Sequence, residues 1–111
     1  MPKDTVTGPD LSLIVGPGDT VSFITACEWP DRRGRRVETC LVYAVVHRRY
    51  GEWTHVYRVV QNDRSPGHLM VYLEKALEGD RVADAREWTL GHLDAVEAAA
   101  AAIRHGRSRR G

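Results

Sequence analysis

Two runs of nine and eleven residues in the middle of the chain are dominated by apolar and β-branched positions with few polar ones, which is typical of β-strands. Residues 37–47 (VETCLVYAVVH) carry apolar side chains on both alternating faces, which predicts a central strand buried on both sides. Residues 53–61 (WTHVYRVVQ) predict a neighbouring strand, joined to the first by a turn over residues 48–52. Upstream, an apolar run at 11–15, a Gly-Pro-Gly-Asp turn and a β-branched run at 20–28 predict another hairpin.

The segment 68–78 (HLMVYLEKALE) allows two interpretations. Leu69, Val71 and Leu73 alternate as in a strand, whereas Leu69, Leu73 and Leu77 also match the spacing of a helix. The β-prone Met-Val-Tyr stretch favours the strand, and the helix stays open as the alternative.

Near the C-terminus the apolar spacing changes to three and four residues, which predicts a helix over residues 91–105. Its alanine block at 98–102 has the highest helix propensity available, and Gly106 suits a helix end. The residues expected to pack this helix on the sheet are Leu93, Val96, Ala100 and Ile103.

Together these elements predict an α+β fold, either a small antiparallel sheet or an SH3-like barrel, with one C-terminal helix. A chain of 111 residues suits one domain. We expect a flexible lead at 1–9, a single globular domain at 10–105 and a basic disordered tail at 106–111.

Charge is unevenly spread, although the formal net charge is only +1. Residues 32–64 hold eight arginines and three acids, and residues 104–111 hold four arginines and no acid. Residues 1–31 and 65–103 are acidic. Local basic clusters decide whether a protein meets a polyanion, so the total charge excludes nothing.

The N-terminus lacks a hydrophobic signal region, and no apolar run reaches the roughly 20 residues of a membrane helix. We therefore expect a cytoplasmic protein with no membrane partner.

Both cysteines bracket the segment CEWPDRRGRRVETC. A turn centred between Arg33 and Gly34 would place Cys27 directly opposite Cys40 on two antiparallel strands. Free thiols, a strained disulfide and a metal site are all open at this point. No second Cys-x-x-Cys or His-x-His spacing completes a tetrahedral site, so we expect no metal and no cofactor.

Arginines interleaved with aromatic residues in two loops form the candidate binding site. Guanidinium groups match phosphate oxygens, and flat rings stack on bases, which predicts single-stranded RNA or DNA as the partner. The tryptophans have an alternative role as core residues, and the two loops lie at opposite ends of the central strand if both hairpins are simple. The candidate residues are Arg32, Arg33, Arg35, Arg36, Arg48, Arg49, Trp29 and Tyr50.

Two patches of the sequence resemble the MazF/PemK ribonuclease toxins: GDTVSF (18–23) followed by GRR (34–36), and WTLGHLDAVEAAAAAI (88–103). The second patch is similar to that family's last strand, Leu-Gly step and C-terminal helix. The resemblance implies a barrel with a helix, a homodimer, cleavage of single-stranded RNA, and a catalytic role for Arg36. The sequence departs from the family at Val37, where proline is expected, and across residues 47–80, so a relative that lacks the activity stays open as an alternative.

Two other classes of function remain open from the sequence. A protein-binding module, such as an inhibitor, immunity or accessory factor, would use the charge blocks against a protein partner. An enzyme of another class would draw on His47, His55 and Tyr57 as acid–base groups.

Overall fold

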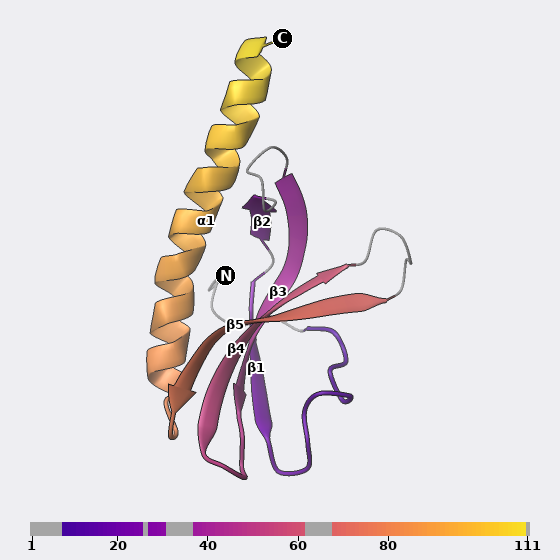
Figure 1. The fold of residues 1–111 in the computed structure, drawn as a ribbon, viewed down its shortest axis with the longest axis vertical. Coiled ribbons are helices and arrows are strands. Elements are labelled where there is room, and N and C mark those ends of the chain that lie inside the picture. Colours follow the sequence, from indigo (N-terminus) through magenta and orange to yellow (C-terminus); the bar gives the residue numbers. More distant parts are fainter. Residues whose placement is uncertain (1–7, 26, 31–36, 62–67, 111) are drawn as a thin grey trace.

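The fold is one antiparallel sheet with a long helix packed across one of its faces (Figure 1). The computed structural model describes residues 8–25, 27–30, 37–61 and 68–110. The sheet has the order β1-β3-β4-β5, and β2 also pairs with β3. The elements are β1 (Thr20–Ile24), β2 (Cys27–Pro30), β3 (Val37–His47), β4 (Trp53–Gln61), β5 (Leu69–Glu78) and α1 (Val82–Arg110).

β3 is the central strand, as its two apolar faces predict. Residues 42–46 are all buried, with Tyr43 and Val45 in the core beneath the helix and Val42, Ala44 and Val46 in the core on the opposite face. Among the described strands β1 and β5 stand at the two edges, so the sheet is open and not closed into a barrel.

β1 and β2 pair with β3 in one continuous register. Ile24 lies opposite Tyr43 and Cys27 lies opposite Cys40, so the two strands continue the same alignment along β3. The predicted cross-strand placement of Cys27 and Cys40 is therefore confirmed.

The segment 11–15 does not form the predicted strand. The backbone N–H groups of Ile14 and Val15 both donate to the carbonyl of Leu11, at 2.9 and 3.0 Å, which closes a local turn. Because these backbone groups bond within the segment, it does not pair with β1 as a strand. Instead Leu11, Ile14 and Val15 cover the sheet face opposite the helix, whereas Leu13 is exposed. The residues that they cover are Val42, Ala44, Val46 and Val59.

β5 confirms the strand interpretation of residues 69–78. It pairs with β4 along its whole length, with a register shift between Val56 and Tyr57. Cross-strand pairing with β4 therefore decides the structure of a segment whose local sequence pattern fitted both a strand and a helix.

α1 is longer than predicted at both ends. It begins at Val82 because Ala85 and Thr89, both fully buried, extend the helical spacing of the core residues backwards. The resemblance implied a last strand at the start of residues 88–103, and those residues lie inside α1 instead. Gly106 is also inside the helix: the described glycines with the left-handed backbone that favours a helix end are Gly18, Gly51 and Gly79. Residues 106–110 are therefore helical, not a disordered tail.

The predicted packing face of α1 is confirmed for Leu93, Val96 and Ala100, which are buried, and Ile103 is half-buried. Replacing Leu93 by alanine should lower the free energy of unfolding by about 2–5 kcal/mol, because the substitution leaves a cavity in the core. Urea denaturation measures the change, with Ala99→Ser on the exposed face as control. Equal effects of the two substitutions would contradict this placement of the helix.

Candidate functional site

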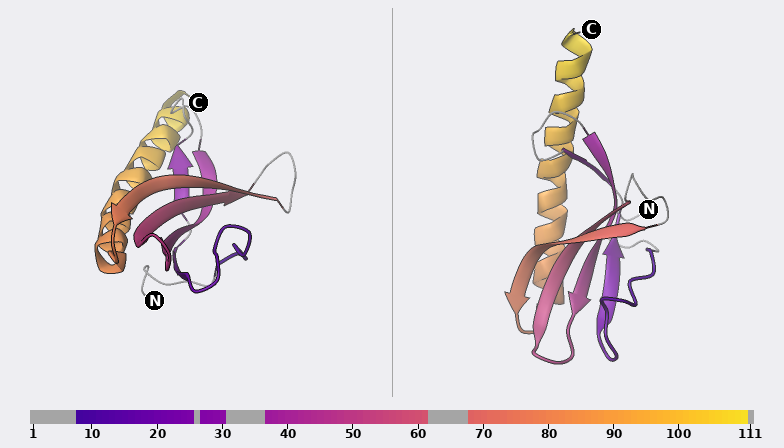
Figure 2. Two further views of the ribbon diagram at one scale, coloured as in Figure 1. Left: turned by 60° about the horizontal axis from the view of Figure 1, so that its bottom comes forward. Right: turned by 45° about the vertical axis from the view of Figure 1, so that its right-hand side comes forward.

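The end of β2, the start of β3 and the C-terminal half of α1 lie at the same end of the molecule. Pro30 at the end of β2 lies opposite Val37 at the start of β3, so residues 31–36 begin and end at this end of the sheet. The C-terminal half of α1 rises beside the same end in all three views (Figures 1 and 2). Residues 106–110, expected to belong to a disordered tail, thus continue α1 at this end.

The predicted contacts of Arg32, Arg33, Arg35 and Arg36 lie outside the described residues. Their binding role, and the catalytic role implied for Arg36, stay predictions.

Trp29 packs as a core residue at the base of this basic end. Its ring centre lies 6.0 Å from that of Tyr43 and 5.5 Å from that of His92, and the side chain is half-buried. The guanidinium of Arg58 lies 4.2 Å from the centre of the Trp29 ring, a cation–π contact. The interpretation of Trp29 as a packing residue is the one that the structure favours.

Arg58 is a part of this cluster that sequence reasoning missed. Its Nε donates to Glu74 Oε1 at 2.7 Å, and its guanidinium lies 4.6 Å from the Tyr72 ring centre. The partners come from β2 and β5, on opposite sides of β4 and β3, so only the tertiary register brings them together. The isolated arginine inside a β-branched strand was the available signal, because a charge at such a position needs a partner.

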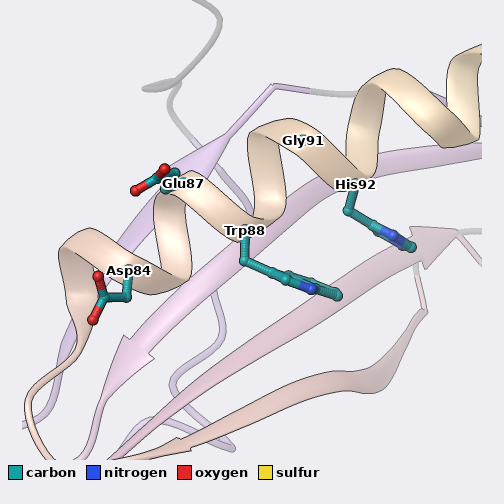
Figure 3. A pocket seen from close by; sticks show the side chains of 5 residues that line it. All are labelled: Asp84, Glu87, Trp88, Gly91 and His92. Carbon is teal, nitrogen blue, oxygen red and sulfur yellow. The ribbon is translucent and has the colours of Figure 1, made fainter.

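His92 and Trp88 line a shallow hollow of about 540 Å³ on α1, together with Asp84, Glu87 and Gly91. The two rings are stacked, with their centres 4.7 Å apart, and they project from successive turns of the helix (Figure 3). His92 Nε2 is buried and has no hydrogen-bond partner within the described ranges. Burial lowers the pKa of His92, and Arg58 adds to this, while Glu74 opposes it. The ring is therefore neutral near pH 7.

Arg48, a predicted nucleic-acid contact, instead ties the N-terminal segment to the sheet at the other end of the molecule. Its Nη1 donates to the carbonyl of Ile14 at 2.6 Å and to Asp19 Oδ2 at 3.0 Å. Its Nε donates to His55 Nδ1 at 3.3 Å, and its Nη2 donates to the hydroxyl of Tyr57. With these donors engaged, Arg48 is a structural anchor.

The same network shifts the acid–base properties of its members. The backbone N–H of Arg49, followed by the Arg48 side chain, holds the pKa of Asp19 below its usual value. Burial and the positive charge of Arg48 lower the pKa of His55. His55 and Tyr57, noted in the sequence as acid–base types, thus meet Arg48 and Asp19 in one cluster.

Arg49 and Tyr50 project from the β3–β4 turn. Tyr50 is 76% exposed, and the Arg49 guanidinium lies 5.5 Å from its ring centre. This turn is at the opposite end of β3 from Pro30 and Val37, so the two arginine loops do not form one site. The surrounding exposed or paired acids at this end are Asp19, Glu52, Glu78 and Asp80.

No family model matches this chain, and neither the curated proteins nor the solved structures contain a match. The resemblance to the MazF/PemK toxins stays a prediction. Among the described residues, no group of three or more His, Cys, Asp or Glu side chains is arranged to hold a metal ion. No helix in the described ranges is long and apolar enough to cross a membrane.

Replacing Arg48 by alanine should destabilise the protein by about 2–3 kcal/mol, because several charge-assisted hydrogen bonds disappear and Asp19 is left without its guanidinium partner. Thermal or urea unfolding measures the loss. Arg49→Ala is the matched control, since that side chain is exposed, and should change stability by less than about 0.5 kcal/mol. A similar effect of both substitutions would mean that the network does not hold the N-terminal segment.

Stability should fall as the pH drops below 6.5, the ordinary histidine pKa. Because the pKa values of His55 and His92 are lowered in the fold, the unfolded chain binds protons in this range and the folded chain does not. Urea denaturation from about pH 7.5 to about pH 5 should show this slope, and a His55→Gln, His92→Gln variant should flatten it. Replacing the exposed His105 by glutamine serves as control; an unchanged slope in the double variant would contradict the assignment.

Proposed function

We propose that this protein binds single-stranded nucleic acid at the end of the molecule where β2 ends, β3 begins and α1 projects. The observation that supports the proposal is that the end of β2, the start of β3 and the C-terminal half of α1 lie at one end of the molecule (Figures 1 and 2), because the two basic blocks of the sequence follow or end these elements. One contributes four arginines within residues 32–36, and the other contributes four arginines within residues 104–111. Clustered arginines repel one another and so contribute little to the stability of the fold. The closely spaced phosphates of a nucleic acid can accept charge-assisted hydrogen bonds from several of them at once.

The charges elsewhere favour this end over the other. The arginines within the sheet are neutralised by the fold, Arg48 by Asp19 and Arg58 by Glu74. The end that carries Tyr50 is bordered by four acids, whereas no acid occurs in residues 104–111. This asymmetry would orient the protein as it approaches a polyanion.

The preference for a single strand comes from the sequence, in which arginines lie next to aromatic residues, because aromatic rings stack on unpaired bases. The Trp29 ring itself packs against Tyr43, His92 and Arg58, so it supports this end of the molecule and is not proposed as the stacking surface.

Gel retardation and fluorescence anisotropy with a long single-stranded RNA test the proposal. Replacing Arg32, Arg33, Arg35 and Arg36 together by alanine should weaken binding and flatten its salt dependence by roughly 0.7 log unit for each phosphate that an arginine no longer neutralises. Replacing Arg104, Arg107 and Arg109 should act in the same direction. Arg49→Ala with Arg81→Ala removes two arginines from the other end and should leave binding nearly unchanged.

The same RNA tests for cleavage. If Arg36 is catalytic, as the resemblance implies, Arg36→Ala alone should abolish cleavage while most of the affinity remains. An absence of retardation by the wild-type protein at low salt, or equal losses in the control, would overturn the proposal. Loss of a stoichiometric protein complex in the arginine variants would instead support a protein-binding module.

A further inference from the structure

β5 forms one edge of the sheet, and its outer side has no strand partner among the described residues (Figures 1 and 2). Along its inner side β5 pairs with β4 over the whole of Trp53–Gln61. The main contacts of α1 are with β2, β3 and β4, so the helix leaves this edge open. The outer side of an edge strand presents backbone N–H and C=O groups to which a further extended chain can bond.

One half of β5 carries the features that normally protect a sheet edge. The register shift between Val56 and Tyr57 leaves Glu74 as an extra residue in β5, and charged residues follow it at positions 75 and 78. Bulges and charges of this kind disfavour pairing with another chain. The other half, residues 69–73 (LMVYL), has no charge, no proline and a regular register. The unprotected edge is therefore confined to these five residues.

Both hydrophobic cores of the protein reach this half of β5. Leu69 and Val71 pack at the margin of the core opposite the helix. Met70 and Tyr72 pack at the margin of the core beneath the helix. These four side chains are only half-buried, and Leu73 is 55% exposed. A strand added beside them would cover apolar side chains on both faces of the sheet while its backbone bonds to the edge.

We propose that residues 69–73 bind an extended segment of a protein partner, which joins the sheet as a strand beside β5. The chemistry of the edge defines this segment. A charged side chain next to Leu69, Met70 or Val71 would lose water without gaining a partner, so the segment is uncharged where it meets them. Its side chains are β-branched or aromatic, since these fit a pleated and partly buried surface. The proposal does not depend on nucleic-acid binding.

Selection from a phage-displayed library of random short peptides, with the full chain as target, tests this proposal. The wild-type protein should enrich uncharged peptides that are rich in Val, Ile, Phe and Tyr. Leu73→Lys places a charge on the exposed edge and should weaken the binding of an enriched peptide at least about tenfold. Val21→Lys is the matched control, because Val21 is an exposed apolar residue on the other edge strand, and it should leave the affinity unchanged.

Methylation of the backbone of an enriched peptide tests for strand addition itself. A strand that joins an edge donates the N–H groups of alternate residues to it and leaves the other set to solvent. N-methyl groups on one alternating set should therefore abolish binding, whereas N-methyl groups on the other set should leave most of the affinity. A mode of binding through side chains alone would respond similarly to both sets, and this result would overturn the proposal.

Two further results would contradict it. One is a wild-type protein that enriches no peptide relative to the Leu73→Lys protein. The other is a wild-type dimer in sedimentation velocity that Leu73→Lys dissociates, because a second copy of the chain would then occupy the edge. Melting temperatures show whether the two lysine variants are folded, as we expect from the exposure of Leu73 and Val21.

Discussion

The fold depends on the need to cover both faces of β3. This eleven-residue strand pairs with β1 and β2 along one side and with β4 along the other. Its two apolar faces cannot both be covered by the sheet itself. α1 therefore packs on one face and the segment containing Leu11 packs on the other. Arg48 bonds this segment to the sheet through the carbonyl of Ile14. Trp29 contacts both Arg58 and the helix residue His92, and so links β2 to α1.

These contacts also account for the charged residues within the sheet. Arginines there have partners in the fold, since a cation in a partly apolar setting requires a carboxylate, a carbonyl or an aromatic face. Within the described sheet, Arg48 and Arg58 are therefore both paired with a carboxylate. The packing of α1 on the core also makes its C-terminal half run past the sheet at the end where β2 ends and β3 begins (Figure 1).

Elements whose structure depends on residues nearby in the sequence were predicted well. The bounds of β3 and β4 follow from apolar, β-branched runs of nine or more residues, and the pairing of Cys27 with Cys40 follows from the symmetry of one hairpin. Errors arose where the local pattern was short or where distant residues intervened. The apolar run at 11–15 was too short to distinguish a strand from a turn, and the hydrogen bond from Arg48 to Ile14 that fixes it spans a third of the chain.

The sequence by itself determined the strands of the central meander, the packing face of α1 and the presence of separate basic and acidic blocks, because these depend on periodicity and composition. Tertiary structure decided which arginines of the sheet are paired with carboxylates and which face of α1 is left to solvent. Those properties depend on the strand register and on the direction in which α1 crosses the sheet. Both arise from long-range burial, which no local window of the sequence contains.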